Sequence, residues 1–321
     1  MGFWLGSNNG IVIKTLNSYF LTRTSPVGYT ILMRLRFALL AILVLAVIGV
    51  WYEVFATRAS SELNVYVLNV GQGDAVYVRA PSGKDMLIDT GPNDKVIAEL
   101  EAVMPSFDRT LDVLLLTHTD ADHTGGAEEV VARYDIGKII ENGASASSSV
   151  YEAYRERAVA RGIPRAVVDT GDVVHIDADV ALDILLPRAQ DVHAKNSGAK
   201  IGTNDIAIVG RLRYKHASML LTADIERRGE VALATSNVEL KSDVLKVAHH
   251  GSKYSSWKLF LDTVRPQLSA ISVGRSNRYG HPAEQALERL FDEGGAVLRT
   301  DRDGRIHLRS TGATFAIVKD E

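Results

Sequence analysis

Apolar and polar residues follow one another along the chain in short segments, and their spacing predicts a series of strands and helices. Residues 63–70 alternate apolar and polar side chains as a half-buried strand does, and residues 75–79 form the second strand of a hairpin after a glycine-rich turn. Apolar side chains recur at helical spacing in residues 93–104. Further strands are predicted at residues 86–89, 111–117, 136–140, 181–186, 206–214, 218–222, 244–248 and 268–273 and around Val297, Ile306 and Phe315, further helices at residues 127–134, 147–161 and 283–291, and a long loop at residues 187–203.

Four of the apolar strands end at a residue that is able to bind a metal ion or to carry a proton. These residues are His118, Asp224, His249 and His281. Sites in layered α/β folds form at the carboxyl ends of strands, so we expect these four side chains to converge on one crevice. Two strand-rich halves, each with helices, predict two sheets packed face to face between helical layers. The expected fold class is therefore α/β (α+β).

The densest group of candidate ligands follows the strand at residues 111–117. Within six residues the chain presents His118, Asp120, Asp122 and His123, and a glycine pair and a helical pattern come next. Imidazole and carboxylate together are the ligand set of zinc, manganese or iron(II), whereas calcium and magnesium prefer oxygen alone. A metal site is therefore predicted here, and a polar turn with incidental histidines is the alternative.

An almost uncharged segment near the N-terminus predicts a membrane anchor. Residues 37–55 contain no charged side chain except Glu53, and about 20 apolar residues are enough for a spanning helix. Basic side chains precede this segment and no acidic residue does, which keeps the N-terminus in the cytoplasm and places the following domain outside it. The basic residues are Lys14, Arg23, Arg34 and Arg36.

These boundaries predict four parts. They are a cytoplasmic segment at residues 1–36, a transmembrane anchor at residues 37–55, a linker at residues 56–62 and an extracytoplasmic domain at residues 63–321. A cleaved signal peptide and a buried core helix are the alternatives for the apolar segment. Met33 begins a sequence typical of such a segment, so it is an alternative start of the protein.

Composition narrows the choice of function only slightly. The chain has 321 residues, of which 46% are hydrophobic, and a net charge of -3, so no global positive field points to a nucleic-acid partner. There is no cysteine, which excludes disulfide bonds and thiolate metal ligands.

Several motifs, taken in order, resemble the metallo-β-lactamase superfamily, and most closely the hydrolase domain of the ComEC competence-protein family. They are residues 70–75 (VGQGDA), 87–91 (LIDTG), 117–126 (THTDADHTGG), 221–224 (LTAD), 245–252 (LKVAHHGS) and 277–282 (NRYGHP). The resemblance covers about residues 63–310. It implies a four-layer αββα sandwich with a metal centre between the two sheets.

The resemblance also implies a set of ligands for one or two divalent ions, zinc or manganese. His118, Asp120, Asp122 and His123 fall on the first motif, Asp224 on the bridging carboxylate, and the last histidine ligand on His249 or His250. Alternation of side chains after a strand favours His249. A histidine expected about twenty residues before Asp224 is missing, and Thr203, Asn204 and Asp205 stand there instead. The site is therefore richer in oxygen, which shifts the preference from zinc toward manganese.

As a hypothesis for the chemistry, the ions would acidify a water molecule, which Asp122 would also orient. His281 and His250 would protonate the leaving oxygen or hold an anionic group of the substrate. Ser252 and Asn277 would offer hydrogen bonds to that group. Asp89 is expected to hold the hairpin or a histidine ring nitrogen instead of binding metal.

A basic stretch suggests the substrate. Residues 241–278 contain seven basic residues and two acidic ones, with aromatic residues among them. The residues expected to touch substrate there are Lys253, Arg278 and Tyr279, since phosphate contacts and stacking hold single-stranded nucleic acid. A packed helix with solvated lysines is the alternative.

We therefore expect a membrane-anchored phosphodiesterase or nuclease that acts on DNA, most simply single-stranded DNA, outside the cytoplasm. One apolar segment cannot form a DNA channel, so a channel would be a separate membrane partner. Hydrolysis of a smaller phosphoester and a binding protein with a degenerate site are the alternatives, and β-lactamase activity is disfavoured. A surface position is expected for His193 and His216.

Overall fold

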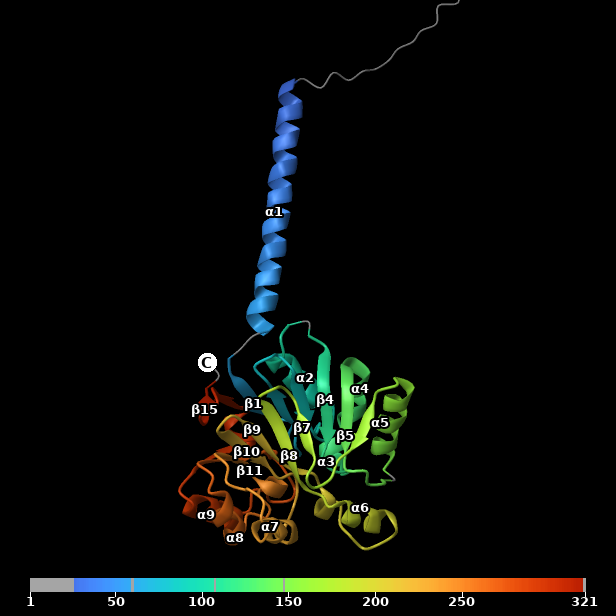
Figure 1. Ribbon diagram of the computed structural model, residues 1–321, viewed down its shortest axis with the longest axis vertical. Helices are drawn as coiled ribbons and strands as arrows, with labels where there is room; N and C mark the ends of the chain where they lie inside the picture. The colour runs from blue at the N-terminus through green and yellow to red at the C-terminus, as the bar shows by residue number, and fades with distance from the viewer. Residues whose placement is uncertain (1–25, 59–60, 107, 147, 320–321) are drawn as a thin grey trace, which may run out of the picture. The chain divides into compact units, whose positions relative to one another are not determined.

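The computed structural model describes residues 26–58, 61–106, 108–146 and 148–319 (Figure 1). The chain divides into two compact units, residues 1–54 and residues 55–321. The first predicted segment, residues 1–36, lies mostly outside the described part of the chain, and so do residues 59–60 of the predicted linker.

Helix α1 (Pro26–Arg58) contains the predicted anchor. Within it, Thr30–Tyr52 is long and apolar enough to cross a membrane, judged by length and composition alone. The helix extends beyond the predicted span at both ends, since Pro26 suits a first helical position and no later proline interrupts it. Three residues of the predicted linker, up to Arg58, are consequently helical.

The second unit contains two sheets. One has eight strands in the order β15-β14-β1-β2-β3-β4-β5-β6, and the other has seven in the order β13-β12-β11-β10-β9-β8-β7. The strands are β1 (Leu63–Val67), β2 (Val76–Arg79), β3 (Asp85–Ile88), β4 (Thr110–Leu116), β5 (Asp135–Glu141), β6 (Arg165–Val167), β7 (Val173–His175), β8 (Val180–Leu186), β9 (Val209–Tyr214), β10 (Ala217–Leu221), β11 (Val244–Lys246), β12 (Leu268–Ile271), β13 (Ala296–Arg299), β14 (Ile306–Ser310) and β15 (Phe315–Val318).

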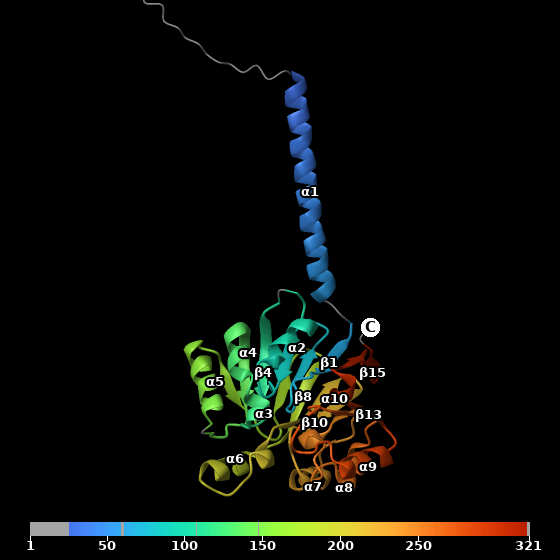
Figure 2. The same ribbon diagram turned by 180° about the vertical axis from the view of Figure 1, so that it is seen from behind.

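Helices cover the outer face of each sheet (Figure 1, Figure 2). The helices of this unit are α2 (Lys95–Val103), α3 (Ala121–Thr124), α4 (Ala127–Arg133), α5 (Ser149–Ala160), α6 (Ala189–Asn196), α7 (Arg227–Ala234), α8 (Lys258–Val264), α9 (Glu284–Asp292) and α10 (Thr300–Asp303), with 3-10 turns η1 (Asn204–Ile206) and η2 (Ala248–Gly251). Helices α2, α4 and α5 pack on the first sheet, and α7, α8 and α9 pack on the second.

Strand alternation builds the layers. In β2, Val76 and Val78 belong to the core between the sheets, whereas Tyr77 belongs to the core under α2, α4 and α5. In β10, Met219 faces the core between the sheets and Leu220 faces the core under α7, α8 and α9. The predicted four-layer αββα sandwich is therefore confirmed.

The predicted loop at residues 187–203 is wrong in part, because it contains helix α6. Only Val192 of this helix is buried, so the segment lacks the apolar periodicity that reveals a helix, although alanine, glutamine and lysine favour one. The short edge strands β6 and β7 and the helix α7 are also additions to the predicted elements. Helix α8, with Phe260 buried and Lys258 exposed, is the packed helix that was the alternative for this part of the basic stretch.

The carboxyl ends of the parallel strands meet the turn that precedes β2. Strands β3, β4 and β5 are parallel, as are β10, β11, β12 and β13. In the turn, a Cβ on Gly73 would lie 2.2 Å from the Asp122 carbonyl oxygen, and its φ of +147° suits glycine. The Asp74 N–H donates to the same carbonyl at 3.2 Å. Glycine therefore allows this turn to lie directly against the segment that carries the metal-binding motif.

A buried ion pair joins the two sheets. Val244 of β11 faces the core between the sheets, and Lys246 lies two residues further on the same side. Its Nζ is 2.7 Å from Asp74 Oδ2, and both side chains are at most 5% exposed. Burial by itself would raise the pKa of Asp74, but the positive charges of Lys246 and His250 hold that pKa below its usual range.

We predict that Lys246→Met lowers the free energy of unfolding by about 3–5 kcal/mol, because it leaves a buried carboxylate without its partner. The control is Lys258→Met, which breaks a pair of the same chemistry and the same 2.7 Å distance, Lys258 with Asp262, at the surface. It should unfold like the unsubstituted protein. The measurement is urea unfolding of the full chain in detergent, and equal midpoints for both variants would contradict the prediction.

Candidate metal centre

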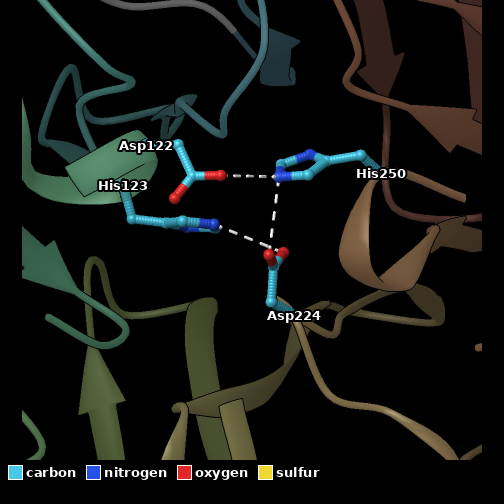
Figure 3. A group of neighbouring side chains, drawn as sticks. All are labelled: Asp122, His123, Asp224 and His250. Atoms are coloured by element: carbon cyan, nitrogen blue, oxygen red, sulfur yellow. Dashed lines mark ion pairs between the residues drawn. The ribbon is translucent and has the colours of Figure 1, made fainter. Parts of the chain in front are cut away.

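Four side chains from both sheets meet at the strand ends. Asp122 and His123 come from α3 after β4, Asp224 follows β10, and His250 follows β11. One potential ligand atom from each lies within 4.8 Å of the others. His123 Nε2 is 3.3 Å from Asp224 Oδ1, and His250 Nε2 is 3.3 Å from Asp122 Oδ2 and 3.4 Å from Asp224 Oδ2 (Figure 3). The group therefore provides two imidazoles and two carboxylates around one point.

The histidine rings are held by their other nitrogen. His123 Nδ1 is 2.7 Å from Asp89 Oδ2, as the prediction for Asp89 expects, and His250 Nδ1 is 2.9 Å from the Ser272 carbonyl oxygen. Thr117 donates its hydroxyl to Asp89 Oδ2, so its oxygen accepts from His118 Nδ1 at 3.0 Å. Each of these Nδ1 atoms is therefore a donor, which leaves the Nε2 atom of each ring as the ligand atom.

Buried atoms without hydrogen-bond partners fit a cation. Nε2 of His118, His123 and His250 and Oδ1 of Asp224 are all inaccessible and have no hydrogen-bond partner. Such groups are costly to bury unpaired, and a divalent ion satisfies imidazole and carboxylate at once. A second group, Asp74 with Asp89 and His123, lies equally close, but its carboxylates already hold Lys246, Thr117 and His123. The residues present thus fit a metal ion at the first group.

The backbone decides which of the adjacent histidines joins the group. His249 and His250 have φ of +50° and +54°, in the left-handed region. Alternation along an extended strand, which favoured His249, does not apply to such a turn. His249 Nε2 is 3.8 Å from Asp224 Oδ2, and its Nδ1 lies 3.1 Å from Glu226 Oε1. The distances therefore favour His250 as the ligand.

Electrostatics couples these residues strongly. Burial lowers the pKa of histidine, but the carboxylates of Asp224 and Asp74 outweigh it and raise the pKa of His250 to about 10. Asp224 and Asp89 likewise raise the pKa of His123 well above its usual value against the effect of burial. His250 and His123 in turn hold the pKa of Asp224 well below its usual range, although burial opposes them. Without a cation, protons on the histidines balance the carboxylates.

The group opens into a small pocket of about 170 Å³. It is lined by Gln72, Asp120, Asp122, Asn204, Asp224, His249, His250, Tyr279 and His281. The ends of β4, β10, β11 and β12 therefore do converge on one crevice, as the strand endings predict. The His118 ring lies beside that of His123, with centroids 4.1 Å apart and the planes tilted by 52°, and its Nε2 is 3.7 Å from Asp120 Oδ2.

Exposed cation–aromatic pairs occur on the loops after β11 and β12, and Tyr279 of one pair lines the pocket. Tyr279 is 56% exposed, stacks on His281 at 5.9 Å, and carries the Arg278 guanidinium 5.3 Å from its ring centre. Lys253 Nζ lies 5.0 Å from the ring centre of exposed Tyr254. Three of the predicted substrate residues, Lys253, Arg278 and Tyr279, thus belong to exposed pairs.

Ser252 and Asn277, also predicted to touch substrate, hold loops instead of lining the pocket. Ser252 is buried, and its hydroxyl accepts from the Tyr254 N–H. The Asn277 amide donates to the Gly274 and His281 carbonyl oxygens and accepts from the N–H of Tyr279 and His281. Its hydrogen-bonding groups are therefore used to shape the loop that carries Tyr279 and His281.

Sequence reasoning missed the contribution of the 70–75 motif to the site. Gln72 lines the pocket, and Asp74 Oδ1 lies 3.2 Å from His250 Nδ1. The motif itself was the available signal. A turn between two strands of one sheet, however, gives no indication that it contacts a candidate metal ligand, His250, which follows a strand of the other sheet. His193 and His216 are exposed, as predicted.

Two face-to-face sheets between helices, with histidines and aspartates at the strand ends, define a metal-dependent hydrolase fold. A family model described as "Metallo-beta-lactamase superfamily" matches residues 68–275, and the chain belongs to this superfamily.

The most informative relatives are competence proteins. ComE operon protein 3 of Bacillus subtilis (strain 168) is 33% identical over 267 residues, which are 78% of this chain and 33% of that protein. Competence protein ComA of Neisseria gonorrhoeae is 33% identical over 254 residues, 77% of this chain and 32% of that protein. The chain therefore spans about a third of the length of these relatives, and the predicted resemblance to this family is confirmed.

Solved structures with the same fold are more distant. Igni18, described as a novel metallo hydrolase from the archaeon Ignicoccus hospitalis KIN4/I, has a TM-score of 0.51 at 15% identity and covers 76% of this chain and 98% of its own. The metallo-beta-lactamase fold protein YhfI from Bacillus subtilis has a TM-score of 0.50 at 11% identity and covers 75% and 96%. These likenesses show the fold alone.

We predict that metal binding at pH 7.5 releases about two protons, because the raised pKa values of His123 and His250 leave both Nε2 atoms protonated in the metal-free chain. Calorimetric titration in buffers of different ionisation enthalpy measures this number. His250→Ala should release about one proton, and the exposed His193→Ala should release as many as the unsubstituted protein. Metal uptake without proton release would contradict the raised pKa values.

The same pKa shifts stabilise the metal-free fold fully below about pH 6.5, and the contribution of His250 to the free energy of unfolding is lost as the pH rises through about 10.

Proposed function

We propose that this protein is a membrane-anchored, metal-dependent phosphodiesterase that cuts single-stranded DNA outside the cytoplasm. The observation that carries the proposal is the group of Asp122, His123, Asp224 and His250, largely buried, at a pocket that is also lined by Tyr279, the partner of Arg278 in a cation–aromatic pair. The relatives include competence proteins and a recombination protein, which favours DNA over other phosphodiesters as the substrate.

Divalent ions, zinc or manganese, would be held by His118, Asp120, Asp122, His123, Asp224 and His250. Such ions acidify water and neutralise charge that develops on a phosphoryl oxygen. The chain itself orients the ligands, through Asp89, Thr117 and Ser272, and excludes water from the group, whose histidines and Asp224 are buried.

His281 is suited to hold an anionic group. Burial and the charges of His249 and His250 lower the pKa of His281 to about 4, so the ring is neutral at pH 7. A neutral imidazole is a poor proton donor to a leaving oxygen, but one ring nitrogen still carries an N–H for a phosphate oxygen. Of its two predicted roles, binding of the anionic group is therefore the better supported. Asp122 remains the residue proposed to orient the nucleophile.

The exposed aromatic residues would bind bases. Single-stranded DNA presents unpaired bases that stack on aromatic rings while cations contact the phosphates. Tyr279, which lines the pocket, provides both features together with Arg278, and Tyr254 with Lys253 forms a second exposed pair. Because the pocket is only about 170 Å³, it suits a phosphate group with the bases lying outside it.

The membrane location rests on helix α1. Its apolar span, Thr30–Tyr52, is long enough to cross a membrane, and Arg34 and Arg36 lie toward its N-terminal end. Arginine on this side favours a cytoplasmic N-terminus and so supports a location of the second unit outside the cytoplasm.

We predict that the full chain in detergent cuts end-labelled single-stranded DNA when manganese or zinc is restored after metal removal. Asp224→Asn should lower the rate by more than about 100-fold, since loss even of a group that only supports a ligand costs about 10–100-fold. The control is Asp135→Asn, whose carboxylate is 82% exposed and pairs with Arg161. Cleavage of small phosphodiesters without cleavage of DNA would favour the smaller-ester alternative. Inactivity on both would favour a binding role.

Tyr279→Ala should weaken DNA binding by about 5-fold to 150-fold, the range that corresponds to loss of one base–aromatic stack. Tyr279→Phe keeps the ring and should bind like the unsubstituted protein. Fluorescence anisotropy with a labelled oligonucleotide in an Asp224→Asn background measures binding without cleavage. Equal affinity of the alanine and phenylalanine variants would remove Tyr279 from the DNA-binding surface.

A further inference from the structure

The two ends of the metal centre differ in their donor atoms. At one end, Asp122, His123, Asp224 and His250 supply two imidazoles and two carboxylates. At the other end, His118 supplies a single imidazole, with its Nε2 buried and without a hydrogen-bond partner. The carboxylate beside it is Asp120, whose Oδ2 lies 3.7 Å from that nitrogen. A cation at the His118 end therefore needs further donors from a neighbouring segment.

Asn204 is the side chain in position to supply one. It begins the 3-10 turn η1 and lines the pocket together with Asp120, Asp122 and Asp224. Its Oδ1 atom is inaccessible to solvent and accepts no hydrogen bond. A buried amide oxygen without a donor is unfavourable, whereas a cation satisfies it.

The segment around Asn204 is fastened to the His118 end from both sides. Thr203 donates its hydroxyl to Asp120 Oδ2 at 3.0 Å. The Asn142 amide donates to the Thr117 carbonyl oxygen at 3.3 Å and to the Ile206 carbonyl oxygen at 2.8 Å. These bonds hold the residues before and after Asn204 against the strand end that carries His118. The placement of Asn204 is therefore set by the fold and does not depend on a free loop.

We propose that Asn204 Oδ1 is a metal ligand, and that it completes an oxygen-rich subsite with His118, Asp120 and Asp224. One nitrogen and three oxygen donors suit manganese better than zinc, because carboxylate and carbonyl oxygens favour harder ions. The other subsite, with two imidazoles, is the one that suits zinc. The oxygen-rich subsite belongs to the metal centre on which the proposed function rests, but its existence is tested without DNA.

The experiment measures metal binding to the full chain in detergent after chelator treatment. Free manganese is followed by its electron paramagnetic resonance signal, and bound zinc by elemental analysis after equilibrium dialysis. The unsubstituted chain should bind two manganese ions. Asn204→Ala should keep one and bind the other about 10- to 100-fold more weakly. The matched control is Asn237→Ala, which removes the amide of an exposed asparagine outside the pocket lining and should bind both ions normally.

Two further variants separate ligation from folding. Asn204→Asp keeps an oxygen donor and should bind two manganese ions at least as tightly as the unsubstituted chain. Asn204→His introduces a nitrogen donor and should weaken manganese while strengthening the second zinc by about 10-fold or more. Circular dichroism tests whether Asn204→Ala is folded. If it is unfolded, Asn204→Asp and Asn204→His decide the question through their opposite metal preference.

The outcomes are distinct. Unchanged manganese affinities in Asn204→Ala and Asn204→His would overturn the proposal, and so would a single manganese ion in the unsubstituted chain. Two manganese ions that respond to Asn204 as expected, in a chain that leaves DNA intact, would support the subsite and contradict the nuclease. Cleavage of DNA with unchanged metal binding in the Asn204 variants would support the nuclease and contradict the subsite.

Discussion

The rest of the structure depends on the contact of the Asp224 carboxylate with two histidines, His123 and His250. Asp224 follows β10 of the second sheet, His123 follows β4 of the first, and their closest atoms are 3.3 Å apart in a buried environment. His250 approaches the same carboxylate at 3.4 Å. A carboxylate in this position is stable only while positive charge surrounds it, either as protons on the histidines or as a bound cation. The packing of the two sheets and the binding of metal consequently depend on the same requirement, that positive charge balances the buried Asp224 carboxylate.

The fold brings these charges together by placing strand ends opposite one another. Parallel strands in each sheet finish at the same edge, and the turn between β1 and the antiparallel β2 adds Asp74 at that edge. Asp74 contacts His250 in the centre and Lys246 in the core, so a structural ion pair and a ligand share one carboxylate. Disturbance of the core between the sheets should therefore reach the metal centre through Asp74.

The substrate side of the site is built differently. Tyr279, Arg278 and His281 lie on a loop that Asn277 shapes through bonds within the loop itself. The curated relatives are about three times as long as the matched region, so the whole-protein activity of a competence protein does not transfer to this chain by similarity. What the comparisons show for this chain is the metallo-β-lactamase fold, and the proposed chemistry rests on that fold and on this chain's own residues at the strand ends.

The sequence by itself determined the layered architecture and the set of strand endings that meet. Strand alternation from Leu63 onward and the apolar runs before His118, Asp224 and His249 are local patterns, and local patterns follow from burial on one or both faces of a strand. Helix α6 was not predicted from the sequence, because only Val192 of that helix is buried and no apolar periodicity results. Edge strands of three residues, such as β6 and β7, are too short for a period to show.

Only the tertiary structure decided which side chains lie together at the candidate centre. The choice between His249 and His250 depends on a left-handed turn that strand alternation does not describe. The orientation of Asn204 depends on bonds from Thr203 and Asn142 to segments more than 60 residues away. The position of Lys246 beside Asp74 depends on the face-to-face packing of two sheets. Sequence spacing specifies which residues leave a strand together, whereas distances between atoms of different strands are set by how whole layers pack, and that is a property of the folded chain alone.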